Sequence, residues 1–183
     1  GIFALTTEAQ SGATLYMVLL AVYQSVLHRY SGQTDIVVGS PVAGRTRREL
    51  EGVVGYFANT LPLRTKFDGS PSFGELLRRV RETCLGAYDH QEIPLERLVL
   101  ELGRDRALSQ APLFQAVLTM ADASPPTFAP AGVTCSAVDL DAGHDGSSKF
   151  DMLRLASEQA DGLHLLAQAR EDLLEGATLE RFL

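Results

Sequence analysis

The chain has 183 residues, of which 45% are hydrophobic and 21% charged, and its formal net charge is −7. This length and balance predict one folded domain or one lobe of a larger one, and they exclude a disordered tail. The acidic charge argues against a nucleic-acid surface, whose footprint is basic, and the most apolar stretch, residues 15–27, is shorter than the roughly 20 residues that a membrane-spanning helix needs.

The chain opens on GIFALTTEAQ, where no basic stretch leads into an apolar run, so no signal peptide is predicted. Cys84 and Cys135 have no CxxC or Cys/His spacing, which predicts ordinary buried thiols in a reducing, cytoplasmic compartment. The closing TLERFL starts like a capped helix at Thr178 and stops after one turn. Both ends therefore look cut from a longer polypeptide.

The first elements in chain order are a helix and a strand. Thr14 is placed to cap a helix that continues through Tyr30, and Gly32 is placed to stop it, because glycine takes the left-handed conformation without steric cost. Residues 36–45, IVVGSPVAGR, begin as a β-branched run and are then punctuated by glycine and proline. This pattern predicts a strand that enters a shaped loop.

The next elements are a second strand and a second helix. Residues 46–52 predict a polar link or a short helical turn, and residues 56–67 predict a strand. Ser72 and Glu75 form an S-x-x-E capping box directly after Pro71. The apolar residues that follow recur at helical spacing, which predicts one buried face, and they are Phe73, Leu76, Leu77, Val80, Cys84 and Ala87.

The second half predicts one more helix and several strands. Pro94 is suited to open a helix that ends at Gly103. Residues 112–120 alternate like a strand, and a further short strand is predicted near residues 133–140. FDMLRLASEQ and LHLLAQAR flank an Asp-Gly turn and predict a hairpin. The mixture of helices and strands predicts an α/β sandwich.

Candidate reaction chemistry is sparse in this sequence. There is no GxSxG, HExxH, GxxxxGK[ST] or GxGxxG motif. The histidines are scattered and are interpreted as surface or capping residues: His28, His90, His144 and His164. A small basic cluster of Arg45, Arg47 and Arg48 suits either a phosphate or acidic partner, or a solvated turn balanced by neighbouring glutamates. From the residues alone, no complete catalytic set and no metal site is predicted.

Five blocks together resemble the condensation domains of nonribosomal peptide synthetases. DIVVGSPVAGR (35–45) is similar to the family's strand and loop block, and VVGYFANTLPLR (53–64) resembles its G-x-F-x-N-T motif, with alanine where valine is commoner. HQEIPLERLV (90–99) resembles the H-Q-[DE]-x-P-[FL]-E block, RDRALSQAPLFQ (104–115) the R-x-L-S-x-x-P-L-F block, and KFDMLRL (149–155) also fits.

The resemblance implies that residues 1–183 are the C-terminal lobe of such a domain, a two-layer α/β sandwich of the chloramphenicol-acetyltransferase type. The family's HHxxxDG motif, which belongs to the N-terminal lobe, is absent here, so no residue takes a catalytic role. The implied activity is peptide-bond formation between groups carried as phosphopantetheine thioesters, with no cofactor bound to this chain directly. The implied partners are the missing lobe, donor and acceptor carrier domains and an adenylation domain.

The resemblance also implies a substrate tunnel, with Gly39, Ser40, Gly44, Gly55 and Asn59 as its expected lining. Two interpretations stay open for these positions. Asn59 either points its amide toward the tunnel or satisfies a neighbouring backbone group, and the glycines and serine either lie beneath the tunnel or only form a tight turn.

Three further residues, Arg45, Arg64 and His90, are expected to make structural or carrier contacts, and Arg64 is expected to pair with a carboxylate. Two alternatives to the condensing lobe also stay open. The first alternative is a non-catalytic module that recruits a carrier or tailoring protein. The second is an epimerization or cyclization relative, although the asparagine and HQEIP blocks of this chain look more like those of the condensing subtype.

Overall fold

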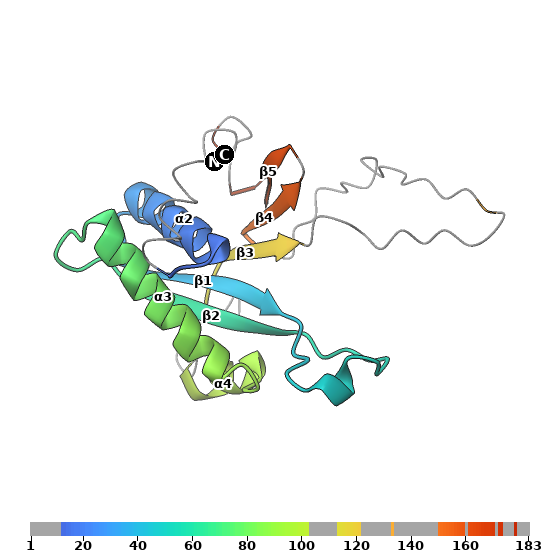
Figure 1. Cartoon of the computed structure of the whole chain (residues 1–183). Coiled ribbons are helices and arrows are strands. Elements are labelled where there is room, and N and C mark those ends of the chain that lie inside the picture. The colour runs from blue at the N-terminus through green and yellow to red at the C-terminus, as the bar shows by residue number, and fades with distance from the viewer. Residues whose placement is uncertain are drawn as a thin grey trace.

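The structure is a computed structural model that describes residues 12–102, 113–121, 133, 150–159, 161–170, 172–173 and 178. Helices and strands are mixed along these residues (Figure 1). The elements are α2 (Leu15–Ser31), β1 (Asp35–Val42), the 3₁₀ helix η1 (Arg48–Leu50), β2 (Asn59–Lys66), α3 (Phe73–Asp89), α4 (Leu95–Leu102), β3 (Ala116–Ala121), β4 (Met152–Gln159) and β5 (Gly162–Ala169).

The described strands form one mixed sheet in the order β2-β1-β3-β4-β5. β1 pairs antiparallel with β2, and β4 pairs antiparallel with β5. β3 lies parallel to both β1 and β4, so it joins the two antiparallel pairs. Val38 lies opposite Leu63, and Ser40 lies opposite Leu61. Because side chains of paired residues share a face and alternate along a strand, these four point to the same side of the sheet.

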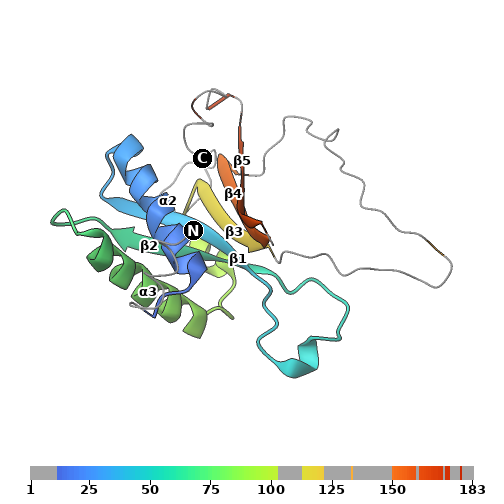
Figure 2. The ribbon, with the colours of Figure 1, turned by 45° about the horizontal axis from the view of Figure 1, so that its top comes forward.

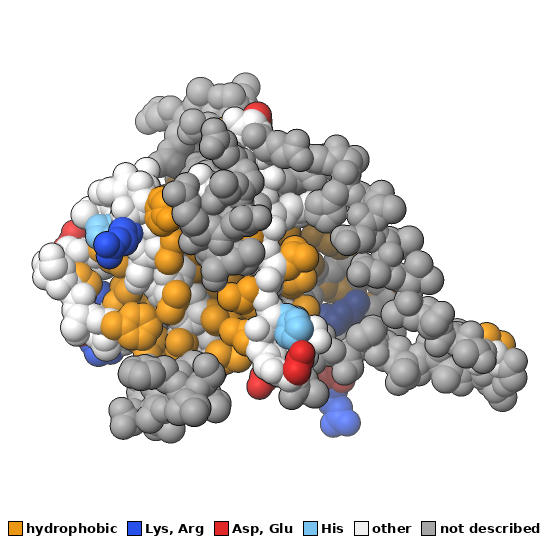
Figure 3. All heavy atoms as spheres, turned by 90° about the horizontal axis from the view of Figure 1, so that it is seen from above, with side chains coloured by type: hydrophobic (Ala, Val, Ile, Leu, Met, Phe, Trp, Pro, Cys, Tyr) orange, Lys and Arg blue, Asp and Glu red, His pale blue; other side chains and the backbone are white. Residues whose placement is uncertain are grey.

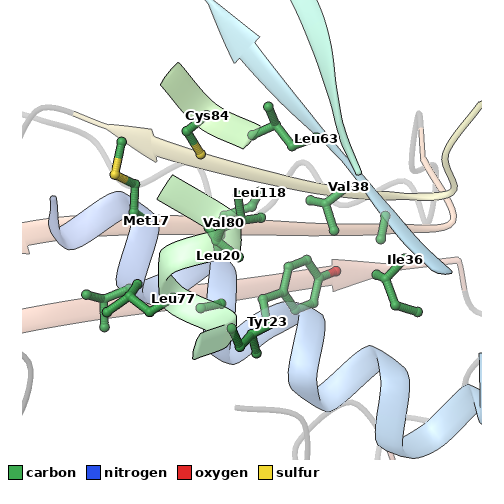
Figure 4. Close-up of a cluster of buried hydrophobic side chains, with 14 of the residues drawn as sticks. Met17, Leu20, Tyr23, Ile36, Val38, Leu63, Leu77, Val80, Cys84 and Leu118 are labelled. Carbon is green, nitrogen blue, oxygen red and sulfur yellow. The ribbon is translucent and has the colours of Figure 1, made fainter. Parts of the chain in front are cut away.

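The two long helices, α2 and α3, lie side by side over one face of the sheet (Figures 1 and 2). Apolar side chains from both helices and from this face form the core (Figure 4). Its most completely buried members include Leu20, Val38, Leu63, Leu77 and Val80. Full burial of such a side chain stabilises a fold by about 1.5–3 kcal/mol. The predicted two-layer α/β arrangement is thereby confirmed for the described residues.

Both long helices begin as predicted. The Thr14 hydroxyl accepts a hydrogen bond from the backbone N–H of Met17 at 3.3 Å. α2 ends before Gly32, whose φ is 69°. The Ser72 hydroxyl accepts the backbone N–H of Glu75 at 3.3 Å, so this half of the capping box is confirmed. The Glu75 carboxylate accepts hydrogen bonds from the two arginines that follow it on α3.

β2 begins at Asn59, three residues later than the predicted start at Tyr56. Residues 56–58 belong to the preceding loop, where the guanidinium of Arg45 lies over the Phe57 ring. The short helical turn predicted within residues 46–52 is confirmed by η1.

β3 begins at Ala116, after the predicted start at Pro112. Phe114 is buried, and its ring lies so close to Gly39 that a Cβ on Gly39 would overlap it. The hairpin predicted over residues 150–170 is confirmed by β4 and β5. The strand predicted near residues 133–140 lies outside the described residues except for Val133, and Cys135 and His144 lie outside them as well.

None of the helices in the described part of the chain combines the length and apolar character that crossing a membrane requires.

Candidate functional site

The connection between β1 and β2, residues 43–58, is a projecting loop that one arginine holds together (Figure 1). Arg45 donates from Nη1 to the carbonyl oxygen of Leu50, and from Nη2 to that of Gly55 at 3.3 Å. Its guanidinium carbon also lies 4.5 Å from the centroid of the Phe57 ring. The planar fork of arginine suits such simultaneous contacts. Arg45 therefore ties the beginning, middle and end of the loop to one another.

Gly44 lets this loop close on itself. Its φ is 65°, a region that residues with a Cβ rarely adopt, and a Cβ there would overlap the carbonyl oxygen of Phe57. At Gly55 a Cβ would lie 3.1 Å from the Phe57 ring, which is tight but leaves the backbone untouched. The close approach that glycine permits in this loop is an approach of the chain's own backbone.

Asn59, the first residue of β2, joins this strand to the segment that connects α3 and α4. Its Nδ2 donates to the carbonyl oxygens of Gln91 at 3.0 Å and Ile93 at 2.8 Å. Its Oδ1 accepts the backbone N–H groups of Thr60 at 2.9 Å and Leu95 at 3.1 Å. A side-chain amide has two donor hydrogens and two acceptor lone pairs, so these four bonds use its full capacity.

An open hollow of about 540 Å³ lies between the loop and this connecting segment. The Thr46 hydroxyl donates to the Glu92 carboxylate at 3.0 Å, which bridges the two segments. The lining residues from the loop and β2 are Gly44, Thr46, Arg47, Leu50, Tyr56, Phe57, Ala58, Asn59 and Thr60, and those from the other segment are Gln91, Glu92, Pro94, Leu95 and Glu96.

Gly44 and Asn59 lie at this hollow, and Gly55 lies beside it against Phe57. Gly39 and Ser40 are not among the lining residues. As neighbours on β1 they face opposite sides of the sheet: Gly39 lies beneath the Phe114 ring, and Ser40 is buried on the helix side. The structure thus brings together three of the five positions for which a shared tunnel was expected.

None of the three residues expected to make structural or carrier contacts is among the lining residues. Arg64 donates to both carboxylate oxygens of Asp35, with an Nε–Oδ1 distance of 2.8 Å. Its predicted pairing with a carboxylate is therefore confirmed. His90 follows the last turn of α3 and its side chain is exposed. The third, Arg45, is engaged within the loop, whereas its neighbours Arg47 and Arg48 are exposed.

Buried titratable groups near Ser40 belong to the core and not to the hollow. Burial raises the pKa of the Cys84 thiol to about 11 and that of the Tyr88 hydroxyl to about 12, and it also raises the pKa of Tyr16. Because the thiolate is the reactive form of cysteine, Cys84 stays protonated and unreactive at neutral pH. The prediction of an ordinary buried thiol is confirmed for Cys84.

The chemistry available at the hollow is that of binding and orientation. Its lining carries amide, hydroxyl, carboxylate and guanidinium groups together with aromatic and aliphatic side chains, but no serine, cysteine or histidine. Among the described residues, no group of three histidine, cysteine, aspartate or glutamate side chains is placed to hold a metal ion. A site of this kind can position a reacting group, and the carboxylates of Glu92 and Glu96 are the groups in its lining that can take up a proton.

A second hollow, of about 500 Å³, lies on the outer face of α2. Hydrophobic side chains gather on the upper face of the molecule (Figure 3), and Val22 and Phe73, which line this hollow, are partly exposed. His28 also lies here, but its ring stacks on Phe67 at a centroid distance of 4.5 Å. None of the predicted site residues lines this second hollow.

Sequence reasoning missed how the two segments around the first hollow are joined. The HQEIP block was noticed, but neither the Thr46–Glu92 bond nor the use of backbone groups at residues 91, 93 and 95 was predicted. The available signal was that Asn59 is the only asparagine in the chain, at the end of a loop and the start of a strand.

The fold is similar to that of solved condensation domains and their relatives. A four-domain nonribosomal peptide synthetase bound to AMP and glycine matches 98% of this chain with a TM-score of 0.83 at 21% identity, over 14% of its own length. The X-domain from teicoplanin biosynthesis matches 98% with a TM-score of 0.80 at 23% identity, over 41% of its length. These likenesses confirm the chloramphenicol-acetyltransferase-like fold that was expected.

The sequence itself is similar to curated synthases. A linear gramicidin synthase of Brevibacillus parabrevis is 46% identical over 94% of this chain, and a plipastatin synthase of Bacillus subtilis (strain 168) is 40% identical over 100% of it. The chain spans only 3% and 7% of these relatives. The sequence profile of the condensation domain family matches residues 4–183. The chain therefore belongs to the condensation domain family.

Proposed function

We propose that this chain is the C-terminal lobe of a nonribosomal peptide synthetase condensation domain, and that the complete domain forms peptide bonds. The observation that carries this proposal is the family match over residues 4–183. The chain covers 41% of the solved condensation domain from a monacolin K polyketide synthase, which supports the view that the rest of the domain is supplied by other residues. The hollow, whose lining carries amide, hydroxyl and charged groups, is consistent with a lobe that positions substrates.

In the proposed reaction, the acceptor amine attacks the carbonyl carbon of the donor thioester. A C–N bond forms, the C–S bond breaks, and the amine proton is removed while the departing thiolate gains one. The histidine of the HHxxxDG motif in the N-terminal lobe would orient or deprotonate the amine. This lobe would contribute position and electrostatic stabilisation, which are the main sources of rate in such a transfer.

The partners in this proposal are the N-terminal lobe, the donor and acceptor carrier domains and an adjacent adenylation domain, in the cytoplasm. Both substrates would arrive as thioesters on phosphopantetheine arms of the carriers, so this chain would bind no cofactor of its own. Gly44, Gly55 and Asn59 would shape the substrate path near the hollow, whereas Gly39 and Ser40 would support it from within the sheet.

The test uses the complete condensation domain with its two carriers, one loaded with a donor and the other with an acceptor. Intact-protein mass spectrometry of the acceptor carrier is expected to show the condensed product. Replacement of the second histidine of HHxxxDG by alanine is the matched control and should abolish the product. If loaded carriers give no product with the intact domain but bind to it, the alternative of a recruiting module is supported instead.

A further inference from the structure

Asn59 lies where the loop, β2 and the α3–α4 connection meet, and all of its hydrogen-bonding capacity is directed at backbone. We propose that Asn59 is a positioning residue, which caps α4 from a distant strand and thereby fixes one wall of the hollow, without contacting substrate itself. The expected effect of Asn59 on peptide-bond formation rests on the proposed function, whereas its expected effect on the shape of the hollow does not.

The first step concerns the start of α4. The first N–H groups of any helix have no partner within the helix, and a serine, threonine, aspartate or asparagine just before it usually accepts one of them. Here Pro94 precedes α4 and its carbonyl oxygen accepts the N–H of Leu98 at 3.4 Å, but its ring offers no side-chain acceptor. The oxygen of Asn59, 36 positions away, accepts the N–H of Leu95 in its place.

The second step concerns the turn before α4. The carbonyl oxygens of Gln91 and Ile93 both accept hydrogen bonds from Nδ2 of Asn59. The same side chain therefore meets two carbonyl oxygens with its nitrogen and two N–H groups with its oxygen. An aspartate would present oxygen to the carbonyl groups, and a leucine of similar shape would leave all four backbone groups without this partner.

The third step links this clamp to the hollow. Gln91, Glu92, Pro94, Leu95 and Glu96 line one wall, and the Asn59 amide binds backbone groups at both ends of this short segment. Because a partly buried polar group that loses its partner is left incompletely hydrogen-bonded, a segment without the clamp would move to find other partners. Asn59 thus acts on whatever occupies the hollow by holding its wall in place.

The experiment compares Asn59→Asp and Asn59→Leu with the unaltered complete condensation domain, by hydrogen exchange and by condensation kinetics. In Asn59→Leu the amide of Leu95 loses its acceptor and should exchange at least about fivefold faster, as expected for the loss of one bond to a backbone group. Asn59→Asp keeps an oxygen for Leu95 but turns another toward the two carbonyl groups, so its exchange at neutral pH should be accelerated less than that of Asn59→Leu. Condensation should slow through kcat, with the KM for the loaded carriers changed less. Thr46→Val is the matched control, because it removes a single exposed bond between the same two segments, and its effect on the Leu95 amide should be small.

Asn59→Asp adds a readout that a loss of folding alone would not produce. A carboxylate facing two carbonyl oxygens has its pKa raised, and the protonated acid can donate one hydrogen bond. Relative to the unaltered domain at each pH, this variant should recover part of its protection and rate as the pH is lowered, whereas Asn59→Leu should not. This comparison keeps the proposal testable even if Asn59→Leu fails to fold.

Two results would overturn the proposal. If Asn59→Leu leaves the exchange rate of the Leu95 amide unchanged but loses condensation, Asn59 would be a substrate-contacting residue. If both the exchange rate and the condensation rate are unchanged, Asn59 would have neither a positioning nor a substrate-contacting role. If the unaltered domain itself forms no product, the proposed function fails, and the exchange measurements still decide whether Asn59 is the clamp.

Discussion

The helix-covered half of the sheet and the two segments around the hollow reach a defined shape by different means. In the first, α2 and α3 bury apolar side chains against β1 and β2. In the second, which we call the loop frame (residues 43–59 and 91–95), two polar side chains, Arg45 and Asn59, bind backbone groups. The comparison teaches that global stability and the shape of the hollow have separate origins, so mutations should separate them.

The largest expected effect is on the core. Leu63→Ala removes a completely buried side chain, and truncations of this kind cost about 2–5 kcal/mol of unfolding free energy because they leave a cavity. Urea unfolding of the complete condensation domain measures this loss. Leu100→Ala is the control, since Leu100 is 72% exposed, and its change should stay within about 0.5 kcal/mol. Equal losses in the two variants would contradict the placement of the core.

A smaller effect is expected from Gly44→Ala, and it should be confined to the loop frame. Both Gly44 and Gly69 have positive φ, but only at Gly44 would a Cβ overlap backbone, whereas Gly69 has open space around it. Each substitution should cost about 1–2 kcal/mol for the left-handed conformation. Only Gly44→Ala should also open the loop, seen as faster tryptic cleavage after Arg47 and Arg48. Equally fast cleavage in Gly69→Ala would show that the loop is not closed by this contact.

Arg45→Lys tests whether the guanidinium fork or merely its charge holds the loop. Lysine keeps the charge but cannot reach two carbonyl oxygens and the Phe57 ring in one plane. Loss of one such hydrogen bond costs about 1 kcal/mol, so the open loop should be about fivefold more populated. Tryptic cleavage in the loop measures this, with Arg48→Lys, an exposed position, as the control. No difference between the two variants would assign the loop's order to other contacts.

The two regions also differ in how far the sequence predicts them. The apolar spacing on α2 and α3 and the caps at Thr14 and Ser72 depend on residues within a few positions of one another, and these predictions are confirmed. Val38 and Leu63 lie in the two predicted strands at residues 36–45 and 56–67, but the pairing of these two strands with each other was left open. Local periodicity thus accounts for most of the described fold.

The loop frame could not be predicted in the same way. Arg45 stood in a basic cluster that suggested a partner or a solvated turn, yet its contacts are to Leu50, Gly55 and Phe57 within the loop. The bonds of Asn59 reach 32 to 36 positions along the chain. Such contacts depend on backbone groups, which every residue carries, so the sequence does not mark which of these groups a side chain reaches. The resemblance singled out Asn59, but only its surroundings in the structure indicate what its amide binds.

The smallest expected effect lies on the exposed surface of the β1–β2 strand pair, toward the end that is remote from the loop. Arg64 and Asp35 form an ion pair with side chains that are 59% and 44% exposed, and such surface pairs contribute about 0–1 kcal/mol and weaken in salt. Arg64→Ala should therefore lower the unfolding free energy only slightly. The loss should shrink further at high ionic strength, unlike the loss from Leu63→Ala.

The pH dependence of this pair has a definite sign. The hydrogen bonds from Arg64 lower the pKa of Asp35 in the folded state, so the carboxylate stabilises the fold above the unfolded pKa of about 3.9, and this contribution is lost as the pH falls through the lower folded pKa. The difference in unfolding free energy between the unaltered domain and Arg64→Ala should therefore be present at neutral pH and vanish in acid. Asp35→Asn should abolish the same contribution without that pH dependence. A difference that persists in acid and in high salt would mean that Arg64 stabilises the sheet by packing its aliphatic stem, and the pair would then belong with the apolar core.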